Sequence, residues 1–226
     1  MFKPTFYQRV ARKMQKSLAP ILIPFRRRLL KNDDFTIISN NCWGGICYEY
    51  FGMQKKSPTV GMWFFAEDYL KFVKNLKYYT SLQLKIIHPE QSKNYDKLVK
   101  MGSESGLVGV LGDIEIILLH YHDPKVAVEK WNRRIERINW NNLIIKFSYM
   151  NECTYDMLKE FDELDLSDIS SHYKKIMFVP RKMPEFNSAV YIKGFEEEKQ
   201  ITNDTFLFNQ YFKLIPFIND EGLVVR

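Results

Sequence analysis

Short, apolar, β-rich runs alternate with longer amphipathic segments along most of this chain, and this alternation constrains the fold more than any other feature. The expected strands are residues 35–39, 59–65, 82–87, 114–120, 143–147 and 175–179. The expected helices are residues 46–51, 66–79, 123–139, 154–164 and 204–212. Strands that alternate with helices imply crossover connections and a largely parallel sheet. We therefore expect an α/β fold.

The architecture that fits best is one three-layer α/β/α domain, Rossmann-like, over residues 32–226. Its sheet should be mostly parallel, with a mixed sheet as the alternative. The run 114–120 is the most apolar and is the expected central strand. Residues 92–106 are polar, and we expect a flexible loop at residues 102–106. At 226 residues with 46% hydrophobic composition, a single core is sufficient.

The first 31 residues carry nine basic side chains and no acidic ones. Since the whole chain has a formal net charge of +6, the remainder is mildly acidic, and a protein-wide nucleic-acid surface is not expected. Apolar residues recur every four positions, at Phe2, Phe6, Val10, Met14 and Leu18. This pattern predicts a basic amphipathic helical arm over residues 1–31, ended by Pro20 and Pro24. The arm would lie on an anionic inner-membrane leaflet or on the domain's own core, and nucleic-acid binding is a weaker third alternative.

The targeting and cysteine signals indicate a cytoplasmic protein. No run approaches the roughly 18 apolar residues that span a bilayer. The beginning of the sequence also lacks the features of a signal peptide. The three cysteines are Cys42, Cys47 and Cys153, an odd and sparse set that indicates reduced thiols, and we expect no metal site.

A polar turn, residues 39–45, follows the first expected strand and opens a helix. Ligands of open α/β sheets gather outside the carboxyl ends of strands, and helix N-terminal amides attract anions. The same field would lower the pKa of the Cys42 thiol and make it a nucleophile, whereas the alternative is a packed cysteine. The residues of the turn that we expect to contact substrate are Asn40, Asn41, Trp43, Gly44 and Gly45.

The segment 112–123 holds two carboxylates and two histidines around an apolar strand. Asp113 and Glu115 lie near its start and are candidate substrate-binding residues. His120 lies at its end and is a candidate general base for Cys42. His120 and His122 together could hold a metal, but the sequence provides no third ligand. A core histidine is the alternative for His120.

The helix after Pro124 carries a basic stripe opposite its apolar face. A solvated surface is one interpretation, supported by an i, i+4 pair between Glu129 and Arg133. Phosphate binding by arginine is the other, with the phosphate of a nucleotide-sugar or a lipid-linked sugar. On that interpretation the candidate substrate-binding residues are Trp131, Arg133, Arg134, Arg137 and Asn139.

Five sequence blocks occur in an order that is typical of one family. They are FTIISNNCWGG (35–45), SPTVG (57–61), DYLKFVKN (68–75), GDIEIILLHY (112–121) and KWNRRIERINWNN (130–142). Together these blocks resemble the bacterial domain-of-unknown-function family 1919, which is labelled exopolysaccharide biosynthesis protein. The resemblance covers roughly residues 35–215 and implies a three-layer α/β/α fold and a role in capsule or exopolysaccharide synthesis. Its motif positions include the turn at 40–45, His120 and the basic helix.

These observations favour a transferase that acts on a sugar or sugar-phosphate during surface-polysaccharide assembly, by glycosyl or acyl transfer. Cys42 and His120 would be catalytic. No cofactor is evident, and the donor would be a nucleotide-sugar or an acyl-CoA. The alternative is a non-enzymatic binding or scaffold module, recruited to the inner membrane by residues 1–31. A thiol-dependent hydrolase is the third hypothesis, and it predicts alkylation of Cys42 near neutral pH.

Overall fold

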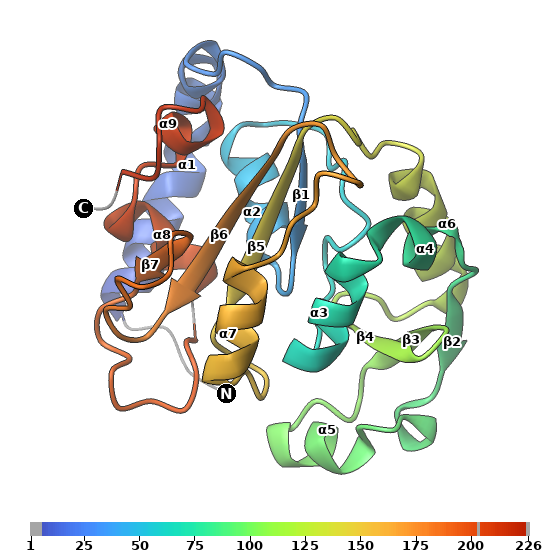
Figure 1. The fold of residues 1–226 in the computed structure, drawn as a ribbon. Coiled ribbons are helices and arrows are strands. Elements are labelled where there is room, and N and C mark those ends of the chain that lie inside the picture. Colours follow the sequence, from blue (N-terminus) through green and yellow to red (C-terminus); the bar gives the residue numbers. More distant parts are fainter. Residues whose placement is uncertain (1–5, 203, 225–226) are drawn as a thin grey trace.

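The computed structural model describes residues 6–202 and 204–224, with only the backbone described for residues 6–9, 11, 12, 14–16 and 206–209. It contains two sheets (Figure 1). The first is parallel, in the order β1 (Thr36–Ser39), β5 (Leu143–Ser148), β6 (Tyr173–Val179) and β7 (Ala189–Tyr191). The second is antiparallel, in the order β2 (Lys85–Ile87), β3 (Leu107–Leu111) and β4 (Ile114–Leu118). The expected α/β fold is confirmed.

Helices cover both faces of the parallel sheet. They are α1 (Phe6–Arg28), α2 (Trp43–Tyr50), α3 (Ala66–Lys74), α4 (Leu76–Ser81), α5 (Tyr95–Met101), α6 (Pro124–Ile135), α7 (Tyr155–Asp162), α8 (Asp204–Tyr211) and α9 (Leu214–Ile218). Because successive strand residues face opposite ways, Ile144 joins one core with Trp43 of α2, and Ile145 joins the other with Tyr69 of α3 and Leu158 of α7. The parallel sheet is therefore the middle of three layers.

The antiparallel sheet is an insertion between β1 and β5, and it corrects the expected position of the run 114–120. That run is not a central strand of the parallel sheet, because β4 pairs only with β3 among the named strands. Gly112 and Asp113 form the two-residue turn of the β3–β4 hairpin, with Gly112 at φ 60°. Residues 59–65 form no strand, and only Trp63 makes an isolated bridge, to Ile117.

Two further segments differ from expectation. The polar stretch 92–106 contains a helix that was not expected, α5, and the expected loop at 102–106 follows it, beginning at Gly102 in the left-handed conformation (φ 63°). The expected helix 66–79 is divided at Asn75 into α3 and α4. By contrast, Thr154 caps α7 as expected, because its hydroxyl accepts a hydrogen bond from the Met157 amide at 3.3 Å.

Helix α1 continues through Pro20 and Pro24 instead of ending there. Each proline removes one helical N–H, but both residues are exposed, where water can hydrate the carbonyls left without a partner. Ile23 lies directly over Gly52, and Arg26 donates to the Tyr50 carbonyl at 3.3 Å, so the end of α1 is docked on the domain. The side chains of Phe2, Phe6 and Met14 lie outside the described residues. Across residues 6–202 and 204–224, no helix combines the length and the apolar character needed to cross a membrane.

Candidate active site

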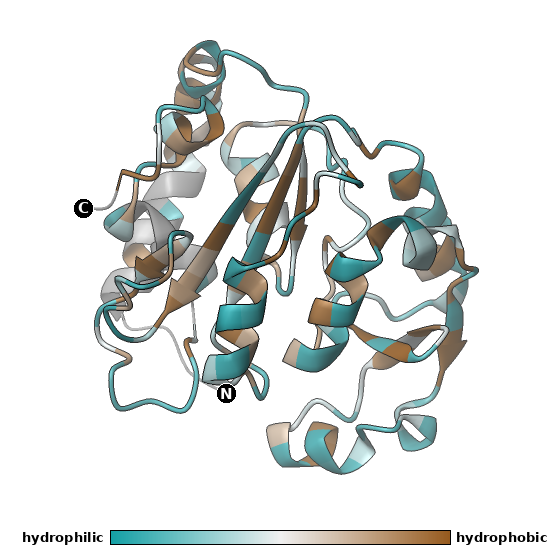
Figure 2. Ribbon diagram, viewed as in Figure 1, coloured by the Kyte–Doolittle hydropathy of each residue, from teal (hydrophilic) through white to brown (hydrophobic). Residues whose placement is uncertain are grey.

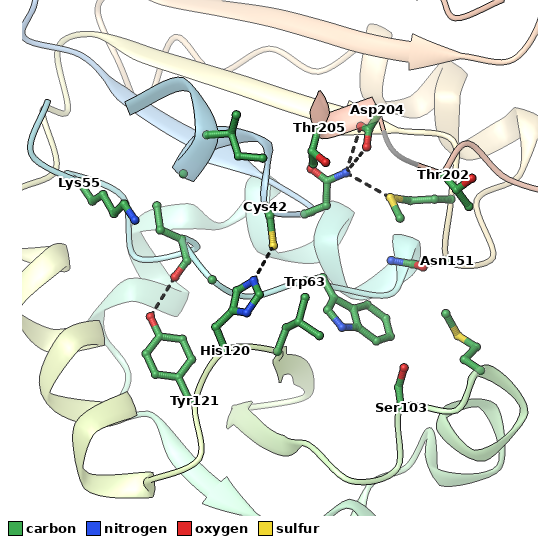
Figure 3. A pocket seen from close by; sticks show the side chains of 18 of the residues that line it. Cys42, Lys55, Trp63, Ser103, His120, Tyr121, Asn151, Thr202, Asp204 and Thr205 are labelled. Atoms are coloured by element: carbon green, nitrogen blue, oxygen red, sulfur yellow. Dashed lines mark hydrogen bonds between the residues drawn. The ribbon is translucent and has the colours of Figure 1, made fainter. Parts of the chain in front are cut away.

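A pocket of about 970 Å³ opens where the carboxyl ends of β1 and β5 meet the antiparallel sheet (Figure 3). Its wall includes Asn41 and Cys42, which follow β1, and Asn151, which follows β5. His120 comes from the turn directly after β4. The pocket thus lies at the edge of the sheet where ligands of open α/β folds bind.

Cys42 and His120 lie next to each other in the lining of this pocket. The Cys42 Sγ atom lies 3.6 Å from the His120 Nε2 atom (Figure 3). Cys42 is the N-cap residue of α2, and the His120 backbone amide is held by the Gly61 carbonyl at 3.3 Å. Nδ1 of His120 has no hydrogen-bond partner among the described residues, so this is a pair without a third orienting group. A thiol and an imidazole at this separation can exchange a proton.

The Cys42 thiol is protonated at neutral pH. Burial raises its pKa to about 11, the Asp204 carboxylate adds to the rise, and the Lys146 ammonium opposes it. The expectation that the helix N-terminus would lower this pKa is therefore wrong, because desolvation and a nearby negative charge dominate. Cys42 would act as a nucleophile only if a base such as His120 took its proton during the attack.

The two charges that act on the Cys42 thiol, those of Lys146 and Asp204, form a buried ion pair. The Lys146 ammonium of β5 is 2.6 Å from the Asp204 carboxylate, and neither side chain is more than 2% exposed. Asn41 links the two, because its amide donates to Asp204 at 3.0 Å and its oxygen accepts from Lys146 at 2.9 Å. The same oxygen accepts from the Trp43 amide at 3.1 Å. The network thereby fixes the turn that carries Cys42.

Part of the pocket lining is cationic. Lys100, Lys130 and Arg134 line it without an acidic partner in the described part of the chain. The Nη1 atom of Arg134 donates to the Val60 carbonyl at 2.8 Å and to the Tyr121 hydroxyl at 2.6 Å, while no partner of its Nε or Nη2 is described. Lys55 also lines the pocket but is neutralised by Glu49 at 2.8 Å. This wall suits an anionic group such as phosphate.

A third part of the wall offers neutral hydrogen-bonding groups. Asn151, Gln200, Thr202 and Thr205 lie there. Asn151 adopts the left-handed conformation (φ 55°), its amide donates to the Gln200 side chain at 3.1 Å, and its side chain donates to the Phe64 carbonyl at 2.9 Å. A non-glycine residue held in this conformation at a pocket is typical of functional sites. Amides and hydroxyls of this kind can bind the hydroxyl groups of a sugar.

The rest of the turn 39–45 supports the site and does not line it, apart from Gly45. Asn40 pairs its side chain with the backbone of Ser148 and so extends the β1–β5 pairing. Trp43 is fully buried among aromatic rings, 5.9 Å from Phe178. A Cβ on Gly44 would lie 3.1 Å from Ile37 Cγ2, and one on Gly45 would lie 3.0 Å from Val60 Cγ1. These glycines therefore allow α2 to pack closely on β1 and on the 57–61 loop.

The two candidate carboxylates lie outside the pocket. Glu115 is buried, and its carboxylate accepts from Ser92 at 2.6 Å, from the Lys93 amide at 2.9 Å and from Asn94 at 3.0 Å. It thereby attaches the 92–94 turn to β4. Asp113 is in the β3–β4 turn, where it accepts from the Tyr79 hydroxyl at 2.8 Å. Both carboxylates therefore accept hydrogen bonds from other residues of the protein, away from the pocket.

Only Arg134 of the candidates after Pro124 reaches the pocket. Trp131 is fully buried in the core, and Arg133 is exposed and pairs with Glu129 at 3.5 Å. Arg137 does not line the pocket. Asn139 lies at the other end of the sheet, where its side chain donates to the Asp34 carbonyl at 2.8 Å. The basic stripe is therefore divided between a pocket side and a solvated side.

Sequence reasoning did not find Lys146, Asp204 or Asn151. A lysine within the apolar run 143–148 was the available signal, since a lysine buried in a parallel strand needs an acidic partner. Nothing in the local sequence of Asp204 indicates that it would be this partner, 58 residues later. Within the part of the chain that the structure describes, no group of three or more His, Cys, Asp or Glu side chains could hold a metal ion.

Two comparisons with known proteins identify the same kind of relative, one whose function is not known. The model of a domain of unknown function, DUF1919, matches residues 13–219. This match begins within α1, so most of that helix belongs to the shared region, although the five sequence blocks all lie after it. An uncharacterized protein of Haemophilus influenzae is 32% identical over 183 residues, which is 81% of this chain and 79% of the relative. The chain therefore belongs to the DUF1919 family.

Proposed function

We propose that this protein is a sugar-modifying transferase in exopolysaccharide or capsule assembly, in which Cys42 and His120 carry out the chemistry. The observation that carries the proposal is the 3.6 Å contact between Cys42 Sγ and His120 Nε2 at a pocket with a cationic wall. The polysaccharide context rests on the label of the family that the sequence resembles. A cytoplasmic setting fits the three free cysteines.

The thiol favours acyl transfer over glycosyl transfer. His120 Nε2 accepts the Cys42 proton while Sγ attacks the carbonyl carbon of a thioester donor such as an acyl-CoA. The donor's carbon–sulfur bond breaks, and its thiolate leaves with the proton from His120. A sugar hydroxyl then attacks the acyl-Cys42 carbonyl and gives its proton to His120, and Cys42 leaves and recovers a proton. Glycosyl transfer would need only His120, as the base for the acceptor hydroxyl.

The pocket walls support a substrate that carries both phosphate and hydroxyl groups. Lys100, Lys130 and Arg134 would bind the phosphates of an acyl-CoA or of a nucleotide-sugar, because none of them has a described acidic partner. The amides of Asn151 and Gln200 and the hydroxyls of Thr202 and Thr205 would bind the sugar. With about 970 Å³, the pocket can hold a ligand of that size.

A thermal-shift screen tests the proposal. Purified protein is melted with nucleotide-sugars, acyl-CoAs and bare nucleotides, since a ligand of the native state raises the melting temperature by mass action. We expect a rise with acyl-CoA that is smaller in Lys130→Gln and unchanged in Arg133→Gln, which is exposed and outside the pocket. A rise only with nucleotide-sugars would favour glycosyl transfer. No rise with any donor would contradict the transferase.

A binding module without catalysis is the second candidate. The observation that favours it is the protonated state of Cys42, whose pKa is raised to about 11. On this alternative the pocket would bind a sugar-phosphate precursor, and Cys42→Ala would bind it as tightly as the unmodified protein does. Neither protein would convert the precursor into a product. Isothermal titration with a lipid-linked sugar-phosphate, together with product analysis, distinguishes the two candidates.

A further inference from the structure

Helix α1 has one face that is already occupied by the domain. Ile23 lies over Gly52, Arg26 donates to the Tyr50 carbonyl and lies 3.9 Å from the centre of the Tyr50 ring, and Leu30 packs against the core of α2 and α9. Asn219 holds the chain just after the helix, because its side chain donates to the Leu29 carbonyl at 2.8 Å. This face of α1 therefore cannot bind a partner.

The other face is apolar and exposed. Ile21 is 73% exposed and Phe25 is 63% exposed, and Leu18 and Leu29, both 45% exposed, extend the same stripe. At about 100° per residue Leu18, Ile21 and Phe25 lie within one side of the helix, opposite Ile23, and Leu29 follows directly after its last residue. Figure 1 places α1 at the margin of the molecule, on the opposite side from the antiparallel sheet. Large apolar side chains gathered in this way mark an interaction surface.

Basic residues accompany this stripe. Lys13 and Arg28 are exposed and have no ion-pair partner among the described residues, whereas Arg27 pairs with Asp33 at 2.9 Å. No acidic residue occurs in the first 31 positions, and nine are basic. Figure 2 shows hydrophobic and hydrophilic residues side by side on the part of α1 that it colours. An apolar stripe bordered by cations is complementary to a surface that is both apolar and anionic.

We propose that α1 binds the surface of an anionic lipid bilayer, lying in the plane of the membrane with Ile21 and Phe25 in the acyl-chain boundary. Lys13 and Arg28 would contact the lipid headgroups. The docked face would hold the domain against the bilayer. This inference stands apart from the proposed chemistry, because it depends only on α1.

A second copy of the chain fits this surface less well. A two-fold contact would place the same patch of α1 on both sides, and would thus bring two strongly basic arms together. Like charges directly opposed across an interface are unfavourable, whereas each basic residue near an anionic membrane contributes roughly 1 kcal/mol of attraction. The charge of the arm therefore favours lipid over self-association.

Co-sedimentation of the full chain with vesicles tests this. The vesicles are phosphatidylcholine alone, or phosphatidylcholine with phosphatidylglycerol. We expect binding to the anionic vesicles, weakened roughly tenfold or more in the double variant Ile21→Gln/Phe25→Gln. Lys13→Gln/Arg28→Gln should weaken it roughly fivefold for each charge removed. Val99→Gln, which removes an apolar residue that is 46% exposed on α5, should bind as the unmodified protein does.

Three results would overturn the proposal. The first is that the chain stays in the supernatant with both kinds of vesicle at low salt. The second is equal binding by Ile21→Gln/Phe25→Gln, provided that its circular dichroism and melting temperature are unchanged. The third is a concentration-dependent dimer, seen by sedimentation without lipid, that the same double variant abolishes, because α1 would then contact a second copy.

Discussion

At the scale of single residues, the state of the Cys42 thiol decides how the site can work. Its pKa is raised to about 11, mainly by burial, so the thiolate fraction at pH 7 is very small. We predict that iodoacetamide labels Cys42 slowly at neutral pH, with a rate that rises about tenfold per pH unit from pH 7 to 10. Mass spectrometry of the labelled peptide, with Cys42→Ala as background, measures this. A rate that levels off below pH 8.5 would instead reveal a thiolate–imidazolium pair.

The two sides of the basic stripe on α6 give a second prediction. Lys130 lines the pocket, whereas Arg133, three residues later, is exposed and pairs with Glu129. We predict that Lys130→Gln weakens the binding of coenzyme A roughly tenfold, because a charge-assisted hydrogen bond is lost, and that Arg133→Gln changes it less than twofold. Isothermal titration provides the dissociation constants. Equal effects of the two substitutions would mean that the phosphate binds outside the pocket.

The sequence could indicate a site residue only where the residues next to it in the chain reveal its position. The polar turn after the first strand singled out Cys42, and the end of an apolar run singled out His120. The two residues do lie close together, but not at the ends of neighbouring strands of one sheet as expected, because His120 follows β4 of the antiparallel sheet. Glu115 has an equally polar local signal, but its partners come from the 92–94 turn, which the local pattern of β4 does not specify.

At the scale of elements, the packing of α2 on β1 depends on Gly44. A Cβ at this position would lie 3.1 Å from Ile37 Cγ2 and 3.1 Å from Ser39 Oγ, both on β1. We predict that Gly44→Ala lowers the free energy of unfolding by about 1–3 kcal/mol through overpacking. The matched control is Gly106→Ala, since a Cβ there would have no atom closer than 3.7 Å. Urea denaturation of both variants measures the difference, and equal stabilities would contradict close packing of α2.

The buried ion pair connects α8 to the parallel sheet. Replacing Asp204 with asparagine leaves the Lys146 ammonium buried without a charged partner, which should cost about 3–5 kcal/mol of unfolding free energy. The double variant Lys146→Met/Asp204→Asn should recover much of this loss. A double-mutant cycle by chemical denaturation gives the coupling, and single and double variants of equal stability would contradict it.

The same pair makes stability depend on pH. Burial opposes ionisation of Asp204, but the charge of Lys146 and hydrogen bonds from Lys146, Ser148 and Asn41 lower its pKa below the ordinary value. A carboxyl group with a lowered native-state pKa stabilises the fold above the unfolded-state pKa of about 4, and this contribution is lost as the pH falls through the native-state value. We therefore predict a decrease in melting temperature below about pH 4 that is smaller in Lys146→Met/Asp204→Asn. A decrease of the same size in that variant would place the acid sensitivity in other groups.

At the scale of the whole molecule, the strand and helix periods were sufficient to predict an α/β fold with β1, β5 and β6 in a parallel sheet. They could not show that the strands within residues 85–118 form a separate antiparallel sheet, because an apolar run such as 114–120 has the same pattern in either kind of sheet. The hairpin turn at Gly112 and Asp113 was the distinguishing signal. Pro20 and Pro24 predicted the end of the first helix wrongly for a related reason. The low helix propensity of proline does not account for the contacts that dock α1 on the domain.

The central claim is that Cys42, assisted by His120, accepts an acyl group. Intact-mass spectrometry of the protein after incubation with a short-chain acyl-CoA, followed by peptide mapping, tests this most directly. We predict one acyl group on Cys42, none in Cys42→Ala, formation slowed about 100-fold or more in His120→Ala, and an unchanged rate in His122→Ala, which lies outside the pocket. A protein without any acyl group, or equal acylation in Cys42→Ala, would contradict the account.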